Sequence, residues 1–157
     1  MLAGTVVLLL KHDLVFYSML EVTRQLLKKA LDEYNCRYQT AFKLSEKYSL
    51  FPNEGEYGYN DEWPGNKHAG VYFVIAKDGE LLYVGESQQS GRRLYEHFPP
   101  ICSSSSQECY IKETWHKRPY YLYVAIVPDD ATWERLSLEA FLIQTLNPID
   151  NSRGKTQ

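Results

Sequence analysis

Two tyrosines in the stretch GVYFVIAKDGELLYVGE, residues 70–86, are the first side chains with a chemical use. Tyr72 and Tyr83 flank an Asp-Gly dipeptide, which predicts a tight hairpin turn. With a two-residue loop, Val74 pairs with Tyr83 and Tyr72 with Gly85, so both phenols share one face and can hold one small group between them. A three-residue loop would separate them, and a purely structural hairpin is the alternative, since tyrosine is common in strands.

A cation and an imidazole follow the hairpin. Residues 90–98 predict a short helix that is stopped by two prolines, and the four-residue spacing of Arg93 and His97 places both on one side of it. Beside two phenols they supply what phosphodiester chemistry needs, namely a fixed cation for phosphoryl oxygens and a group that transfers a proton near neutral pH. The alternative is an ordinary solvated helix face.

A carboxylate lies on the most apolar helix of the same region. Glu139 is surrounded by leucine, alanine, phenylalanine and isoleucine in the helix expected over residues 129–146. Such a carboxylate can bind a divalent metal, because hard cations accept oxygen ligands and keep several waters with only one or two carboxylates. The alternative places Glu139 at the solvent edge of the helix.

A change of hydrophobic period divides the chain into two parts. Between residues 13 and 48, apolar side chains recur at spacings of three, four or seven, which predicts one amphipathic helix or two in succession. The apolar run 2–10 is expected to be a buried strand or an ordered tail, too short to span a membrane. Residues 52–67 carry turn-forming residues and predict a linker. We expect an N-terminal helical extension with its linker over residues 1–65 and a second domain over residues 66–157.

The second domain predicts an α/β fold of the α+β type. The hairpin, the short helix, an apolar strand over residues 120–127 and the glutamate-bearing helix follow in the order β-β-α-β-α. We therefore expect a small mixed, mainly antiparallel three-stranded sheet flanked by helices.

Composition limits the classes of function. The 157 residues are 44% hydrophobic and 24% charged with a net charge of −3, which is ordinary for a globular protein. Because the chain has no basic surplus, any nucleic-acid site must be a local patch. Three cysteines without paired CxxC spacing argue against a disulfide framework and a structural zinc site, and favour a reducing cytoplasmic location.

Taken together, these residues resemble the GIY-YIG endonuclease family over roughly residues 70–151. The resemblance implies a DNA endonuclease that hydrolyses phosphodiester bonds with one divalent metal, Mg²⁺ or Mn²⁺. The motifs that carry it are GVY at 70–72, YVG at 83–85, GRRLYEH at 91–97, LEAFLIQTLNP at 138–148, and Asn151.

The resemblance also implies a role for each motif residue. Tyr72 would be the general base or would position water, and Tyr83 would orient water or phosphate. Arg93 would stabilise charge on the phosphate, and Glu139 would bind the metal. Asn151 would brace the site.

Two positions depart from the family's usual pattern. His97 stands where many members have tyrosine, and an imidazole accepts a proton more readily than a phenol, so the base is either Tyr72 or His97. Glu86 follows the second motif, where many relatives have lysine. If Glu86 points into the site, it repels phosphate or adds a metal ligand; if it points outward, it changes little.

Contacts with DNA and with other chains are less sharply defined. We expect Arg92, Lys112, Lys117 and Arg118 to contact the DNA backbone, and for the last three an ordinary exposed loop is the alternative. A non-catalytic nucleic-acid-binding module that retains the nuclease fold is the alternative function. A third possibility is association of the N-terminal helix with a second copy or a partner protein, although packing on its own domain is more common for such a stripe. DNA specificity and biological role stay open.

Overall fold

The computed structural model describes residues 3–51, 62–99 and 109–152 of the chain. Within residues 3–17 it describes the backbone and, among side chains, only that of Val15. In this described part, no helix combines the length and the apolar character needed to cross a membrane.

One antiparallel sheet forms the centre of the molecule. Strands β3 (Gly70–Ala76) and β4 (Leu81–Ser87) form the hairpin, and β5 (Pro119–Ile126) pairs with the other side of β3. Two short strands, β1 (Lys43–Leu44) and β2 (Tyr48–Ser49), pair with β5. The sheet therefore has five strands in the order β1-β5-β3-β4, with β2 also beside β5, and β4 lies at an edge.

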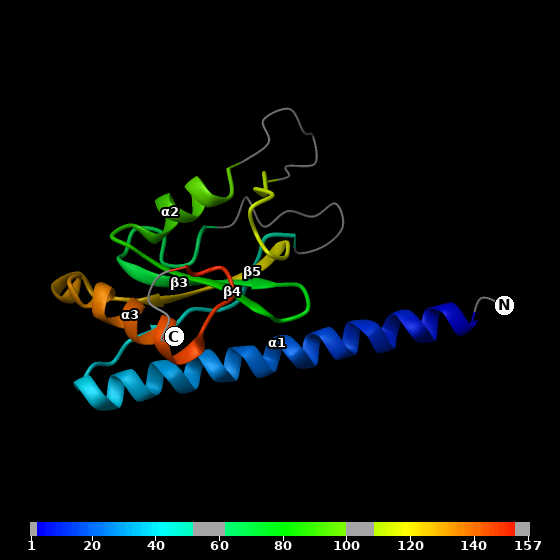
Figure 1. The fold of residues 1–157 in the computed structure, drawn as a ribbon, viewed down its shortest axis with the longest axis horizontal. Coiled ribbons are helices and arrows are strands. Elements are labelled where there is room, and N and C mark those ends of the chain that lie inside the picture. Colours follow the sequence, from blue (N-terminus) through cyan, green and yellow to red (C-terminus); the bar gives the residue numbers. More distant parts are fainter. Residues whose placement is uncertain (1–2, 52–61, 100–108, 153–157) are drawn as a thin grey trace.

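Helices cover both faces of this sheet (Figure 1). Helix α2 (Ser90–His97) lies over one face, and α1 (Ala3–Tyr38) and α3 (Glu134–Leu146) lie over the other, with a short 3₁₀ turn, η2 (Asp129–Ala131), before α3. Every residue of β3 is buried, because alternate side chains enter two hydrophobic cores on opposite faces. The expected α+β class is confirmed.

The N-terminal part differs from the expected pattern at both ends. The apolar run expected as a strand or tail is helical from Ala3 onward, and α1 ends at Tyr38. The expected three strands are joined by β1 and β2, which lie where the pattern predicted helix. Ser45 shows why: its amide donates to the Val124 carbonyl at 2.8 Å, and its hydroxyl accepts from the Val124 amide at 2.9 Å. Pairing with β5 thus outweighs the local helical pattern in this segment.

The apolar stripe of α1 packs on the sheet. Its buried residues belong to the same core as Val71 and Phe73 of β3, and the Tyr34 hydroxyl lies 2.7 Å from the Ser137 hydroxyl of α3. A further row on the same helix stays about half exposed. The buried members are Leu20, Leu27, Ala30, Leu31 and Tyr34, and the exposed row is Val15, Met19, Val22 and Leu26.

The hairpin reaches its expected register by an unexpected route. The turn holds three residues rather than two, because the Gly79 amide donates to the Ala76 carbonyl and the Ala76 amide donates to the Glu80 carbonyl. Gly79 has a φ of +89°, which a glycine adopts without strain. A β-bulge at Leu82 then shifts the register by one residue. The bulge returns Tyr83 to the face on which a three-residue loop alone would not place it.

Candidate active site

The two phenols share the α2 face of the sheet. Val74 pairs with Tyr83 and Tyr72 with Gly85, as the two-residue-loop register predicted, and the ring centroids of Tyr72 and Tyr83 are 6.0 Å apart. Glycine at 85 makes this arrangement possible. A Cβ there would lie 2.5 Å from Cζ of Tyr72 and 2.6 Å from Cε1 of Tyr83, so any larger residue would displace the phenols.

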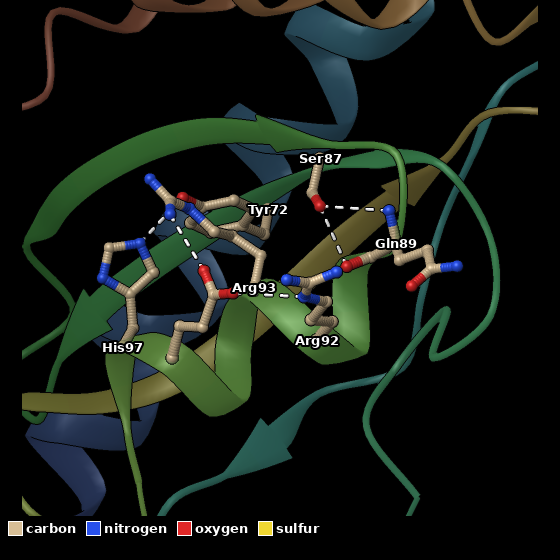
Figure 2. A network of polar contacts seen from close by, with 7 residues as sticks. Tyr72, Ser87, Gln89, Arg92, Arg93 and His97 are labelled. Atoms are coloured by element: carbon tan, nitrogen blue, oxygen red, sulfur yellow. Dashed lines mark hydrogen bonds and ion pairs between the residues drawn. The ribbon is translucent and has the colours of Figure 1, made fainter.

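Helix α2 starts directly after β4, so it positions its side chains over the phenols. Its first amides are satisfied by backbone, since Ser90 donates to the His68 carbonyl at 3.0 Å and Gly91 donates to the Asn66 carbonyl at 3.1 Å. At its last turn, Nε2 of His97 lies 2.9 Å from the Tyr72 hydroxyl (Figure 2).

Burial keeps this phenol and this imidazole neutral. Tyr72 is 1% exposed, and burial, followed by the nearby Tyr83, raises its pKa well above the usual 10. Burial, followed by the positive charges of Arg93 and Lys112, lowers the pKa of His97 to about 4. At neutral pH the imidazole is therefore uncharged and can accept a proton, whereas the phenol does not ionise on its own.

Arg93 lies beside this pair on the solvent side. Its guanidinium donates to Glu96 at 3.1 Å, and Arg92 donates to the other Glu96 oxygen at 3.2 Å (Figure 2). Arg93 and Tyr72 are close enough for each to change the pKa of the other. Glu96 was missed at the sequence level, although its spacing of three and four residues from the arginines indicates this contact.

The carboxylate of Glu139 lies on α3, at the edge formed by β4. It is partly buried, and burial, followed by the negative charge of Glu86, raises its pKa above the usual range. Glu139 also contributes to the raised pKa of Tyr72, which places the carboxylate within electrostatic reach of the phenol. The predicted base and the predicted metal ligand are therefore within electrostatic reach of each other, although α3, which carries Glu139, covers the opposite face of the sheet from α2.

Glu86 is paired rather than free. Its Oε2 accepts from Nε of Arg135 at 2.6 Å, and the Arg135 side chain is only 13% exposed. A second Arg135 nitrogen donates to the Thr132 carbonyl at 2.6 Å. Arg135 compensates part of the charge that seemed opposed to phosphate binding, and no local spacing in the sequence indicates this pair, because its members lie 49 positions apart.

Several of these charged side chains, though not that of Glu139, line a cleft of about 760 Å³. Three arginines and two glutamates contribute to its walls, so the cleft is mildly basic in a protein of net negative charge. Its lining residues are Glu86, Ser87, Gln88, Gln89, Arg92, Arg93, Glu96, Thr132 and Arg135.

Asn151 acts on the backbone of the site. Its Oδ1 accepts from the Val84 amide and its Nδ2 donates to the Val84 carbonyl, both at 2.8 Å. These bonds satisfy outward-facing groups of the edge strand between Tyr83 and Gly85, as a further strand would. Asn151 thus has the geometry of a brace for the edge strand.

The residues predicted to contact DNA are spread over the molecule. Arg92 lines the cleft, and Lys112 is near enough to lower the pKa of His97. Lys117 instead forms ion pairs with the carboxylates of the β3–β4 turn, and Arg118 lies over a ring of Phe51 at 4.2 Å. The structure therefore brings two of the four to the site.

A pH test separates the neutral histidine from an ordinary exposed one. Because the folded pKa of His97, about 4, lies below the usual 6.5, the unfolded chain binds this proton first as the pH falls. The contribution of neutral His97 to the free energy of unfolding is therefore complete above pH 6.5 and is lost as the pH falls toward 4. The free energy of unfolding changes over this range by at most about 1.4 kcal/mol per pH unit. We expect His97→Gln to reduce the pH dependence of the free energy of unfolding, measured by urea denaturation, whereas exposed His116→Gln preserves it. Equal slopes in wild type and His97→Gln would contradict the assignment.

Comparison with known proteins places this site in a family. The sheet and its helices first define an α+β domain that holds two phenols, an imidazole and an arginine beside one cleft. A model of the GIY-YIG catalytic domain matches residues 68–153, more than half of the chain, and all six predicted site residues lie within it. The chain belongs to the GIY-YIG family, whose catalytic domain is a nuclease domain, with DNA as the implied substrate. No curated protein and no solved structure gives a significant match.

Proposed function

We propose that this chain is a metal-dependent DNA endonuclease that hydrolyses phosphodiester bonds and leaves 5′-phosphate and 3′-hydroxyl ends. The observation that carries the proposal is the neutral Tyr72–His97 pair, joined at 2.9 Å, with Arg93 beside it. Because this buried pair is neutral, it needs no charged partner to be stable in the folded protein. It nevertheless lies next to a cleft lined by arginines.

The carboxylates of the site fit a divalent cation. Glu139 and Glu86 are near enough for Glu86 to raise the pKa of Glu139, and a cation would remove this repulsion. Mg²⁺ or Mn²⁺ would be held by Glu139, with Glu86 as the second candidate ligand and with water and phosphate oxygens completing the shell. When bound, the cation would neutralise charge on the phosphate and lower the pKa of water. Among the described residues, no group of three or more His, Cys, Asp and Glu gathers, which suits an ion bound partly by its substrate.

The attacking water transfers its proton through the phenol. The Tyr72 oxygen accepts the proton from water while its own proton passes to Nε2 of His97, so the phenol stays neutral throughout. A new bond forms between the water oxygen and phosphorus, and the bond from phosphorus to the 3′ oxygen breaks. That oxygen takes a proton from solvent. In this scheme His97 is the final base and Tyr72 the relay.

Binding of DNA makes His97 a better base. Arg93 and Lys112 lower its pKa as long as their charges are not neutralised. A phosphate held by Arg93 and a neighbouring phosphate at Lys112 would offset these charges and so raise the pKa of His97, while burial, the larger cause of the lowering, would still keep it below its usual value. Arg93 at the same time stabilises the charge that develops on the phosphoryl oxygens.

The alternative, a non-catalytic binding module, drew its support from the net charge of −3 and from Glu86. The ion pair with Arg135 at 2.6 Å removes much of that support, because the charge of Glu86 is compensated inside the cleft. The net charge of −3 stays as support for this alternative.

A metal-removal experiment tests the proposed function. We expect purified full-length protein to nick supercoiled plasmid in Mg²⁺ or Mn²⁺ and to stop in EDTA, with ends that DNA ligase rejoins. A shift of the thermal unfolding midpoint on adding Mg²⁺ without DNA provides a readout independent of activity. DNA binding without cleavage in either metal would instead select the binding module.

A further inference from the structure

A second hollow adjoins the cleft on the other side of α2. It has a volume of about 400 Å³ and shares Gln89 and Arg92 with the cleft, so the two lie next to each other at the start of the helix. Its lining residues are Trp63, Asn66, Lys67, Gln89, Gly91, Arg92 and Tyr95. We call this hollow the aromatic groove.

One wall of the aromatic groove is held rigidly by the protein. The Trp63 ring packs on Tyr48, which is 8% exposed on β2, with 4.9 Å between ring centroids. The Asn66 side chain donates to Glu62 at 3.1 Å and lies against Gly91, where a Cβ would be 2.8 Å from Cγ of Asn66. The indole and the floor beside it are therefore in place before any ligand binds, which reduces the entropy cost of binding.

The chemistry of the aromatic groove matches an unstacked nucleotide. Tyr95, about half exposed, supplies a second aromatic ring from α2. Lys67 is exposed, and Arg92 keeps a 77% exposed side chain while its Nε pairs with Glu96, so two cations can be reached by phosphate oxygens. Aromatic walls with cations at the rim are the usual means of binding single-stranded nucleic acid without sequence preference.

We propose that the aromatic groove holds a nucleotide of the substrate strand next to the bond that is cut, with its base against Trp63 and Tyr95 and its phosphate at Arg92 and Lys67. The inference rests on the proposed function and extends it to a substrate class, DNA with unpaired nucleotides beside the cleavage point. In an intact duplex each base is already stacked and paired. Such a base would have to leave the stack before it could contact the aromatic wall of the groove.

Binding to an inactive protein tests the groove apart from catalysis. Glu139→Gln protein in EDTA is mixed with a duplex bearing a single-stranded overhang that contains 2-aminopurine, and with the matching blunt duplex. We expect tighter binding of the overhang with quenching of the fluorescent base. Adding Tyr95→Ala should weaken overhang binding by about fivefold or more and reduce the quenching, because base stacking contributes at this level. Trp63→Ala should act likewise if it folds, which circular dichroism decides.

The matched control is Tyr110→Ala, which removes an equally exposed tyrosine outside the aromatic groove. It should leave both affinity and quenching unchanged. Unaltered overhang binding in Tyr95→Ala, or equal affinity for overhang and blunt duplex, would overturn the groove proposal even where wild-type protein cuts plasmid. Groove-dependent binding by a wild-type protein that cuts no DNA would overturn the endonuclease proposal and support the groove.

Discussion

Tyr72→Phe protein is expected to lose DNA cleavage by about 10²- to 10⁴-fold, the usual contribution of a positioned proton-transfer group. The change removes the hydroxyl 2.9 Å from Nε2 of His97 and keeps the ring that fills the space opposite Gly85. Plasmid nicking in Mg²⁺ under single-turnover conditions measures the loss. Stability should fall by only about 1 kcal/mol, the net value of one hydrogen bond.

Tyr123→Phe is the matched control for this prediction. Tyr123 is also 1% exposed and lies on β5, on the opposite face of the sheet in the core beneath α1. Burial raises the pKa of the Tyr123 phenol to about 12, so its environment is similar to that of Tyr72. The substitution removes its hydroxyl without changing the site. If both variants cut DNA at the wild-type rate, Tyr72 is a structural residue and the relay is wrong.

Glu139→Gln protein is expected to lose cleavage by about 10²-fold or more, the range found when one electrostatic group of a site is removed. The amide keeps the shape of the side chain and removes the negative charge that would hold the cation. Since the raised pKa of Glu139 shows that its ionised form is unfavourable in the folded protein, the substitution should preserve or increase stability at neutral pH. Thermal unfolding and plasmid nicking, measured on the same samples, check both parts.

Two further variants make this prediction specific to the site. Glu134→Gln removes a charge from the same helix. Because the Glu134 side chain accepts a hydrogen bond from Tyr34 and does not line the cleft, this variant should cut DNA at the wild-type rate. Glu86→Gln should raise the Mg²⁺ concentration needed for half-maximal cutting if Glu86 is a second ligand. Retention of metal-dependent cutting by folded Glu139→Gln protein would remove Glu139 from the metal site.

The hairpin shows how much of the fold the local sequence pattern predicts. Alternation along β3 and β4 predicted that Tyr72 and Tyr83 share a face if the loop holds two residues; they share a face, although the turn holds three. The bulge at Leu82 compensates for the longer turn, and a single inserted residue leaves no periodic signal. The same reason explains the missed strands β1 and β2, whose two residues each are too short to show a period.

By itself, the sequence determined the order of strands and helices over residues 68–153. It also determined the residue types that a phosphodiester-cleaving site requires. Both follow from the period and spacing of residues within single elements, which are local properties of the sequence. Only the tertiary structure decided their chemistry. It paired Glu86 with Arg135 across 49 positions of sequence. The packing also buries His97, which lowers its pKa to about 4. It places Trp63 and Tyr95 in the lining of one groove. Burial and long-range charge depend on which elements pack together, so they are properties of the folded chain.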